Sequence, residues 1–201
     1  MSTITTPETI DEAAAVVVRR EVRIAAPVDL VWRLHTDIAR WPAWQTDIEA
    51  AQLDEPLRAG TTFTWRTHGL EVASTVHAVD APRRILWGGP AQGIDGLHEW
   101  TFTADGDATI VRTAESWDGD PVRADSDNLR TALESSLGAW LELMRVTAET
   151  KAAKRAARSR RRRRAKLLAW SSLGLSALFV LAEPLLLVPL VGFVLALSLW
   201  D

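Results

Sequence analysis

The sequence contains no cysteine and no tyrosine among its 201 residues. Without thiols the chain can form no disulfide, no thiolate nucleophile and no zinc site built on thiolate ligands, which fits a reducing compartment. The four histidines, His35, His68, His77 and His98, lie on different predicted elements without the close spacing of a metal-ligand pair. Ser-His-Asp spacing, a glycine-rich phosphate loop and a nucleophile elbow are also missing. We therefore expect no metal site and no cofactor.

Charge divides the chain into two parts of opposite sign. Residues 1–150 contain 24 of the 26 acidic residues and 13 of the 23 basic ones, a net charge of about −11. The other ten basic residues lie in 151–166, and the net charge beyond residue 150 is about +8. About 150 residues are enough for one domain with its own core. We divide the chain into a flexible leader (1–15), a domain (16–150), a basic linker (151–166) and a hydrophobic segment (167–200).

The last part of the chain combines basic residues with a long apolar run. A basic cluster precedes 167–200, where Glu183 is the only ionisable residue; it consists of Arg160, Arg161, Arg162, Arg163, Arg164 and Lys166. A bilayer core requires roughly 20 apolar residues in a helix, and flanking basic residues stay on the cytoplasmic side. We expect a cell-membrane anchor, with the cluster on the lipid headgroups and the domain in the cytoplasm. No N-terminal apolar stretch indicates export.

Two alternatives remain for this part of the chain. A basic run is also typical of a solvated helix face or a nonspecific nucleic-acid patch, although we expect no specific nucleic-acid partner. The number of crossings is open as well, because Glu183 and Pro184 divide the apolar run into two arms. A hairpin with these residues at the far interface, which we favour slightly, explains both of them. A single tilted span beginning near Leu173 is the other solution.

Hydrophobic periodicity predicts an α+β domain. Val16–Ile24 has the pattern of a strand, and residues 25–44 that of a helix in which Pro42 ends the stretch. From about Ser126, apolar residues three and four apart predict a long helix. Between the two helices, runs separated by turn residues predict six strands of an antiparallel meander; they are Ile48–Leu53, Thr61–Thr67, Leu70–Asp80, Arg83–Gly89, Ile94–Ala104 and Ala108–Trp117.

The order of these elements, with several short motifs, resembles the START-like (SRPBCC) superfamily of polyketide cyclases, dehydrases and lipid-transport proteins. The motifs are IAAPVDLVWRLHTDIARWPAWQTDI near the start, HEWTF before the Asp-Gly turn, and LRTALESSLGAWLELMRVTAE on the last helix. The resemblance covers roughly Val16 to Glu149 and excludes the basic and apolar tail. It implies a helix-grip fold, in which a curved seven-stranded sheet wraps around the C-terminal helix. It also implies a cavity between them for a hydrophobic small molecule.

Strand alternation indicates which side chains share the inner face. If Asp105 and Gly106 form the last hairpin turn, His98 lies opposite Thr113 and Gly96 opposite Glu115. Packed core is the more common fate of tryptophans across from a helix stripe, but eight of the ten tryptophans belong to this domain, and large apolar walls suit a pocket. The expected cavity residues are Phe63, Trp65, Trp87, His98, Trp100, Phe102, Val111, Thr113, Glu115, Trp117, Leu133, Leu137, Trp140 and Met144.

Two functions of different classes fit this pattern. The first is a membrane-tethered module that binds a lipid-like or polyketide-like molecule, with membrane lipids as a further partner. The second is an enzyme of the cyclase or dehydratase kind, in which His98 and Glu115 act as general acid and base. A register shifted by one residue would instead turn both side chains to solvent. We favour the binding module.

Overall fold

The computed structural model describes the backbone of residues 6–182 and the side chains of residues 6–164. The chain divides into two compact units, Met1–Ala153 and Lys154–Asp201. Glu183, Pro184 and residues 185–200 of the predicted hydrophobic segment lie outside the described residues. In the part that is described, no helix is long and apolar enough to cross a membrane.

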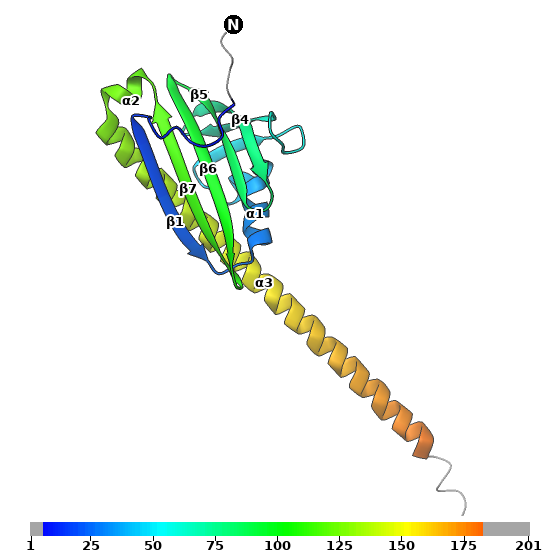
Figure 1. Ribbon diagram of the computed structural model, residues 1–201. Coiled ribbons are helices and arrows are strands. Elements are labelled where there is room, and N and C mark those ends of the chain that lie inside the picture. Colours follow the sequence, from blue (N-terminus) through cyan, green and yellow to red (C-terminus); the bar gives the residue numbers. More distant parts are fainter. Residues whose placement is uncertain (1–5, 183–201) are drawn as a thin grey trace, which may run out of the picture. The chain divides into compact units, whose positions relative to one another are not determined.

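The first unit is a seven-stranded antiparallel sheet with a long helix packed on one face (Figure 1). The strands have the order β1-β7-β6-β5-β4-β3-β2, so each neighbour in space is a neighbour in sequence except β1, which pairs with β7. The strands are β1 (Val16–Ile24), β2 (Ile48–Gln52), β3 (Thr62–Thr67), β4 (Leu70–Asp80), β5 (Arg84–Ala91), β6 (Ile94–Asp105) and β7 (Ala108–Asp118). The helices are α1 (Val28–Thr36), the 3-10 helix η1 (Ile38–Ala43), α2 (Asp120–Ala124) and α3 (Ser126–Ala182). The predicted antiparallel sheet and long C-terminal helix are therefore confirmed.

The helical stretch predicted over residues 25–44 is interrupted in the structure. It splits into α1 and η1 at Asp37, and Pro42 lies inside η1 rather than ending the stretch. The last carbonyl groups of a helix have no hydrogen-bond donor within the helix. At the end of α1, the indole Nε1–H of the buried Trp41 donates to the carbonyl of His35 at 2.7 Å. The break thus turns Trp41 into the core. The short helix α2 was not predicted.

The hairpin of β6 and β7 has a different register from the predicted one. The turn consists of Gly106 and Asp107, so Asp105 pairs with Ala108 and His98 lies opposite Glu115. Gly106 has a φ of 60°, and Asp107 has no positive φ, as in a type II′ turn with glycine at its first central position. The predicted pairing was therefore wrong by two residues. A shift of two leaves each side chain on its predicted face.

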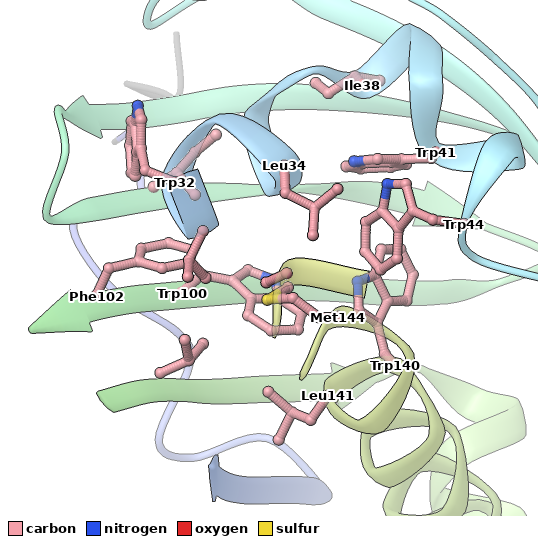
Figure 2. Packing of buried hydrophobic residues seen from close by; sticks show 14 of the residues in the cluster. Trp32, Leu34, Ile38, Trp41, Trp44, Trp100, Phe102, Trp140, Leu141 and Met144 are labelled. Carbon is pink, nitrogen blue, oxygen red and sulfur yellow. The ribbon is translucent and has the colours of Figure 1, made fainter. Parts of the chain in front are cut away.

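Two clusters of buried side chains join the sheet to the helices. The larger contains Trp41 and Trp44 after α1, Trp100 and Phe102 of β6, and Trp140 of α3. Figure 2 shows the indoles of Trp41 and Trp44 beside that of Trp140, and the ring centroids of Trp41 and Trp140 are 5.3 Å apart. The smaller cluster joins the start of α3 to β1 and α2; its buried members are Val16, Val18, Val122, Leu133 and Leu137.

Part of the predicted leader contacts the outer face of the sheet. Ile10 is buried, and the backbone N–H of Asp11 donates to the hydroxyl of Ser116 at 3.0 Å. The hydroxyl of Thr9 donates to the carboxylate of Glu99 at 2.7 Å. Ser116 and Glu99 alternate with inward-facing residues of β7 and β6, which places these contacts on the face away from α3. The leader was expected to be flexible. Its residues 9–11 are attached to the sheet by one buried apolar side chain and two hydrogen bonds.

Candidate functional site

A cavity of about 370 Å³ lies between the inner face of the sheet and α3. Its walls come from strands β2 to β7, from the segment after η1 and from one side of α3. Four tryptophans line the cavity, namely Trp65, Trp87, Trp117 and Trp140. The ring planes of Trp65 and Trp87 lie at 82° to one another. The volume is near the lower end of the range for ligand pockets, roughly 300 to 1,000 Å³. The cavity therefore suits a compact hydrophobic molecule.

Two tight hairpin turns border one end of the cavity. His68 and Gly69 join β3 to β4, Gln92 and Gly93 join β5 to β6, and all four residues have positive φ. Two such residues in a two-residue loop are typical of a type I′ turn. Leu70 lines the cavity next to the first turn and is 45% exposed. We place the mouth of the cavity at these turns.

Glycines shape the wall formed by β5 and β6. Gly88, Gly89 and Gly96 all line the cavity. A Cβ atom on Gly88 would meet the carbonyl oxygen of Gly96 at 2.1 Å, a backbone clash that only glycine avoids. A Cβ atom on Gly96 would instead lie 3.5 Å from the indole of Trp117, an ordinary contact. Gly88 is thus required by the close approach of the two strands, whereas the missing side chain at Gly96 leaves free volume inside the cavity.

The structure brings eight of the fourteen expected cavity residues to the cavity wall. These are Trp65, Trp87, His98, Glu115, Trp117, Leu133, Leu137 and Trp140. The other six are buried in the core instead, toward the end of the sheet that α1 covers; they are Phe63, Trp100, Phe102, Val111, Thr113 and Met144. Strand alternation gives the face of a residue but not its position along the cavity. The six buried residues therefore lie on the predicted inner face but beyond the end of the cavity.

Several lining residues were missed because they lie in turns or have no side chain. Gln45 and Asp47 follow η1, Gln92 is in a turn, and none of them belongs to a periodic pattern. The Gly88-Gly89 pair within a strand was a usable signal, because glycine in a strand marks a close backbone approach or a ligand-facing gap. Ser136, one helical turn before Trp140, was also missed. The polar part of the lining was therefore harder to predict than the apolar part.

His98 and Glu115 form the most polar contact of the cavity. Nδ1 of His98 is 3.1 Å from Oε2 of Glu115, and Nε2 of His98 is 2.8 Å from the hydroxyl of Thr113. The indole Nε1–H of Trp117 donates to Oε1 of Glu115 at 2.7 Å. Both ring nitrogens of His98 and both oxygens of Glu115 thus have a partner. The side chain of Glu115 is 14% exposed and that of His98 is 4% exposed, so the carboxyl group is the more accessible of the two.

Burial opposes charge on both members of this pair. Burial raises the pKa of Glu115 to about 7, although the hydrogen bond from Trp117 acts in the opposite direction. Burial lowers the pKa of His98 well below its ordinary value, and the nearby His35 lowers it further. At slightly acidic pH the carboxyl group is therefore protonated and the imidazole is neutral. Each partner then carries one hydrogen, and the Nδ1–Oε2 contact is bridged by the hydrogen of either the imidazole or the carboxyl group.

His35 is a second buried histidine, on α1, outside the cavity lining. Its ring packs between aromatic side chains, with its centroid 4.4 Å from that of Trp100. Neither ring nitrogen has a hydrogen-bond partner among the described residues, and burial lowers the pKa of His35 to about 3. His35 therefore behaves as a neutral aromatic core residue near neutral pH. No three His, Cys, Asp or Glu residues gather as a metal site in the described part of the chain.

The basic cluster lies in the second unit, within the helical residues 154–182. Arg160, Arg161, Arg162, Arg163 and Arg164 are all exposed. The side chain of Lys166 lies beyond those that the structure describes. The cluster therefore belongs to a different unit from His98 and Glu115.

A family model described as "Polyketide cyclase / dehydrase and lipid transport" matches residues 15–165. The chain belongs to this family. The match includes the whole sheet, the cavity and α3 as far as residue 165, so it extends beyond the expected limit at Glu149 into the basic cluster. No protein of curated function matches the chain. Membership in the polyketide cyclase/dehydrase and lipid transport family supports a domain that binds a hydrophobic small molecule.

Solved structures show the same fold at low sequence identity. A hypothetical protein from Helicobacter pylori has a TM-score of 0.61 at 21% identity, over 74% of this chain and 97% of its own. A START superfamily protein from Mycobacterium smegmatis has 0.59 at 13% identity, over 67% and 97%. The Zhui aromatase/cyclase from Streptomyces sp. R1128 has 0.56 at 21% identity, over 66% and 93%. At these identities the similarity establishes the START-like fold and not the ligand or the reaction.

Proposed function

We propose that the protein binds a compact hydrophobic molecule, lipid-like or polyketide-like, in the cavity between the sheet and α3. The observation that carries this proposal is the cavity itself, which has a volume of about 370 Å³ and is lined by Trp65, Trp87, Trp117 and Trp140. Indole side chains present large rigid apolar surfaces and suit flat or elongated hydrophobic ligands. The Zhui aromatase/cyclase has the same fold, and the family description of this chain names polyketide cyclases, which together support a polyketide-like ligand.

The test is to identify what the protein retains and to block the cavity. The full-length protein is purified and small molecules that copurify are analysed by mass spectrometry. Gly96→Val places a side chain inside the cavity beside Trp117, and Gly138→Val is the matched control, because nothing lies within 4 Å of a Cβ atom on Gly138. We expect the retained molecule to be lost in the first variant and kept in the second. Equal retention by both variants would exclude the cavity as the binding site.

A second candidate, an enzyme of the cyclase or dehydratase kind, is favoured by one specific observation. The 3.1 Å contact between His98 and Glu115 places a titratable pair on the cavity wall, with the pKa of Glu115 raised to about 7. General acid and base groups work best with a pKa near the working pH. In a dehydration, a base removes a proton from carbon while an acid protonates the departing hydroxyl group, so that water leaves. Glu115 could perform the proton transfers while His98 holds its carboxyl group.

Turnover separates the two candidates. The double variant His98→Ala, Glu115→Ala is compared with the parent protein for ligand retention and for conversion of candidate linear polyketides. Conversion by the parent protein that disappears in the double variant, with the ligand still retained, would support the enzyme. Retention of ligand by a parent protein that converts none of the candidates supports the binding module.

We also propose that the C-terminal part of the chain attaches the protein to the inner face of the cell membrane. The support comes from the sequence, in which the exposed basic cluster precedes an apolar run to Trp200. Basic residues near an anionic membrane surface contribute about 1 kcal/mol each. We expect the full-length protein to stay with the membrane fraction in 1 M salt, and a chain ending at residue 166 to be released.

Two outcomes would contradict the tether. Recovery of the full-length protein in the aqueous fraction without detergent would exclude it. Strongly salt-dependent association of the chain ending at residue 166 with DNA, and none with anionic vesicles, would instead assign the basic cluster to nucleic acid.

A further inference from the structure

The cavity distinguishes hydrophobic ligands by charge, an inference that rests on the binding function proposed above. The ionisable side chains among its described lining residues are Asp47, His68, His98 and Glu115. None of the lining residues that the structure describes is lysine or arginine. A buried carboxylate or phosphate requires a positive partner or several hydrogen-bond donors, since desolvating an unpaired charge is very costly. An anionic ligand such as a fatty acid therefore finds no lysine or arginine in the described lining, whose two histidines are the buried His98 and the exposed His68 in the turn at the mouth.

Two of the polar contacts inside the cavity meet at Glu115. The imidazole of His98 is held from both sides, by Thr113 at Nε2 and by Glu115 at Nδ1. The indole N–H of Trp117 fixes the other carboxyl oxygen of Glu115. A carboxyl group has about four acceptor positions and, when protonated, one donor. After these internal contacts Glu115 still has hydrogen-bonding capacity, and its partial exposure lets a bound molecule reach it.

The same network lets Glu115 act as donor or acceptor. If the imidazole carries its hydrogen on Nδ1, it donates to Glu115, Nε2 accepts from the Thr113 hydroxyl, and the carboxyl proton is free for a ligand. If the hydrogen is on Nε2, the imidazole donates to Thr113 and accepts the carboxyl proton, which leaves acceptor positions for a ligand. The Thr113 hydroxyl fits both arrangements because it can donate or accept. A ligand hydroxyl or carbonyl group can be satisfied in either case.

We propose that Glu115 binds the polar end of an uncharged hydrophobic ligand that carries a hydroxyl or carbonyl group, and that the cavity discriminates against anionic ligands. The polar end lies at the Glu115–His98 contact, and the apolar body lies against Trp65, Trp87 and Leu137 toward the mouth at Leu70. Lipid transport as a general class would include fatty acids and phospholipids. This geometry restricts the ligand to neutral molecules such as phenols, enols, ketones or alcohols.

The test uses four probes with the same ring system, measured with the full-length protein at pH 6. They are naphthalene, 2-naphthol, 2-naphthoate and protonated 2-naphthylmethylamine, and binding is followed by calorimetry. We expect 2-naphthol to bind at least about tenfold more tightly than 2-naphthoate, because no lysine or arginine of the described lining offsets the charge of the anion. Glu115→Leu should weaken 2-naphthol binding about tenfold, the effect of one lost hydrogen bond, and leave naphthalene binding intact. Retained naphthalene binding shows that the variant still has a folded cavity.

Glu115→Gln refines the test, because the amide group donates and accepts hydrogen bonds but cannot ionise. The affinity of Glu115→Gln for 2-naphthol should stay within about threefold of the parent protein. The ratio of its affinities for 2-naphthol and 2-naphthoate should be smaller than in the parent protein. Glu71→Gln is the matched control, since Glu71 is exposed on the opposite face of β4 from Leu70 and Val72. It should bind all four probes as the parent protein does.

The outcomes separate this inference from the function on which it rests. Equal or tighter binding of 2-naphthoate, tightest binding of the ammonium probe, or an unchanged 2-naphthol affinity in Glu115→Leu would overturn the assignment while leaving a hydrophobic binding site. The assignment would also be overturned if the parent protein bound naphthalene as tightly as 2-naphthol, or more tightly. Failure of all four probes to bind would overturn both this inference and the proposed binding of compact hydrophobic molecules.

Discussion

The buried carboxyl group of Glu115 makes folding stability depend on pH in a direction that can be measured. Its pKa is about 7 in the folded protein, against an ordinary value of 4.5. Between these values the folded protein holds a proton that the unfolded chain releases, so the free energy of unfolding falls as pH rises. The stabilisation by the bound proton is complete below pH 4.5, the ordinary pKa, and is lost as pH rises through about 7. Each pKa unit corresponds to about 1.4 kcal/mol, which gives a total effect of about 3 kcal/mol.

Replacing Glu115 by glutamine removes this proton and keeps the shape of the side chain. Relative to Glu115→Gln, the parent protein should lose about 2 to 3 kcal/mol of unfolding free energy between pH 5 and pH 8. His98 has a lowered pKa and acts in the opposite direction, losing stability as pH falls below about 6.5, but both proteins contain it. The assay is urea denaturation at half-unit pH steps, with Glu71→Gln as the control for loss of an exposed acid. Parallel curves for the parent protein and Glu115→Gln would refute the buried, protonated carboxyl group.

Three further predictions concern the core and the glycine wall. Trp100→Ala should lower the unfolding free energy by about 3 to 5 kcal/mol, because Trp100 is completely buried, and a loss below 1 kcal/mol in urea denaturation would contradict this packing. Burial lowers the pKa of His35 to about 3, so the free energy of unfolding falls as pH drops below the ordinary pKa of 6.5. Between pH 7 and pH 4, urea denaturation should show that the parent protein loses about 3 kcal/mol more unfolding free energy than His35→Phe. Equal losses in the two proteins would refute the burial of the ring without a hydrogen-bond partner. Gly88→Ala should strongly lower the melting temperature measured by circular dichroism while Gly96→Ala changes it little, and the reverse order would show that the two strands do not approach as described.

The strands and their faces could be predicted because alternation depends only on neighbouring residues. β1 and β4 have their predicted bounds, β5 differs by one or two residues at each end, and the other strands differ by one residue at one end. The pairing across the last hairpin could not be predicted reliably, since the sequence Asp105-Gly106-Asp107 allows glycine at the first or the second central position of the turn. The structure places Gly106 first, which brings His98 opposite Glu115 rather than Thr113.

The extent of the cavity was less predictable than the fold. Phe63 and Trp65 share a face of β3 in the predicted pattern, yet only Trp65 lines the cavity, because the indole of Trp41 packs against Phe63 with ring centroids 5.5 Å apart. Trp41 reaches that position through the break between α1 and η1, where its indole N–H donates to the carbonyl of His35. Periodicity contains no information about such a contact. The depth of the cavity therefore follows from packing between segments distant in sequence.

The two glycines of the β5–β6 wall have different consequences for how relatives of this protein can diverge. Position 88 tolerates no side chain while the strands keep their spacing, so a change there requires a rebuilt sheet. Position 96 accepts one at ordinary contact distance, and each added methyl group there subtracts volume from the interior. An alanine at position 96 can thus reduce the space for a ligand without disturbing the scaffold, so the selectivity of the cavity can change separately from the fold.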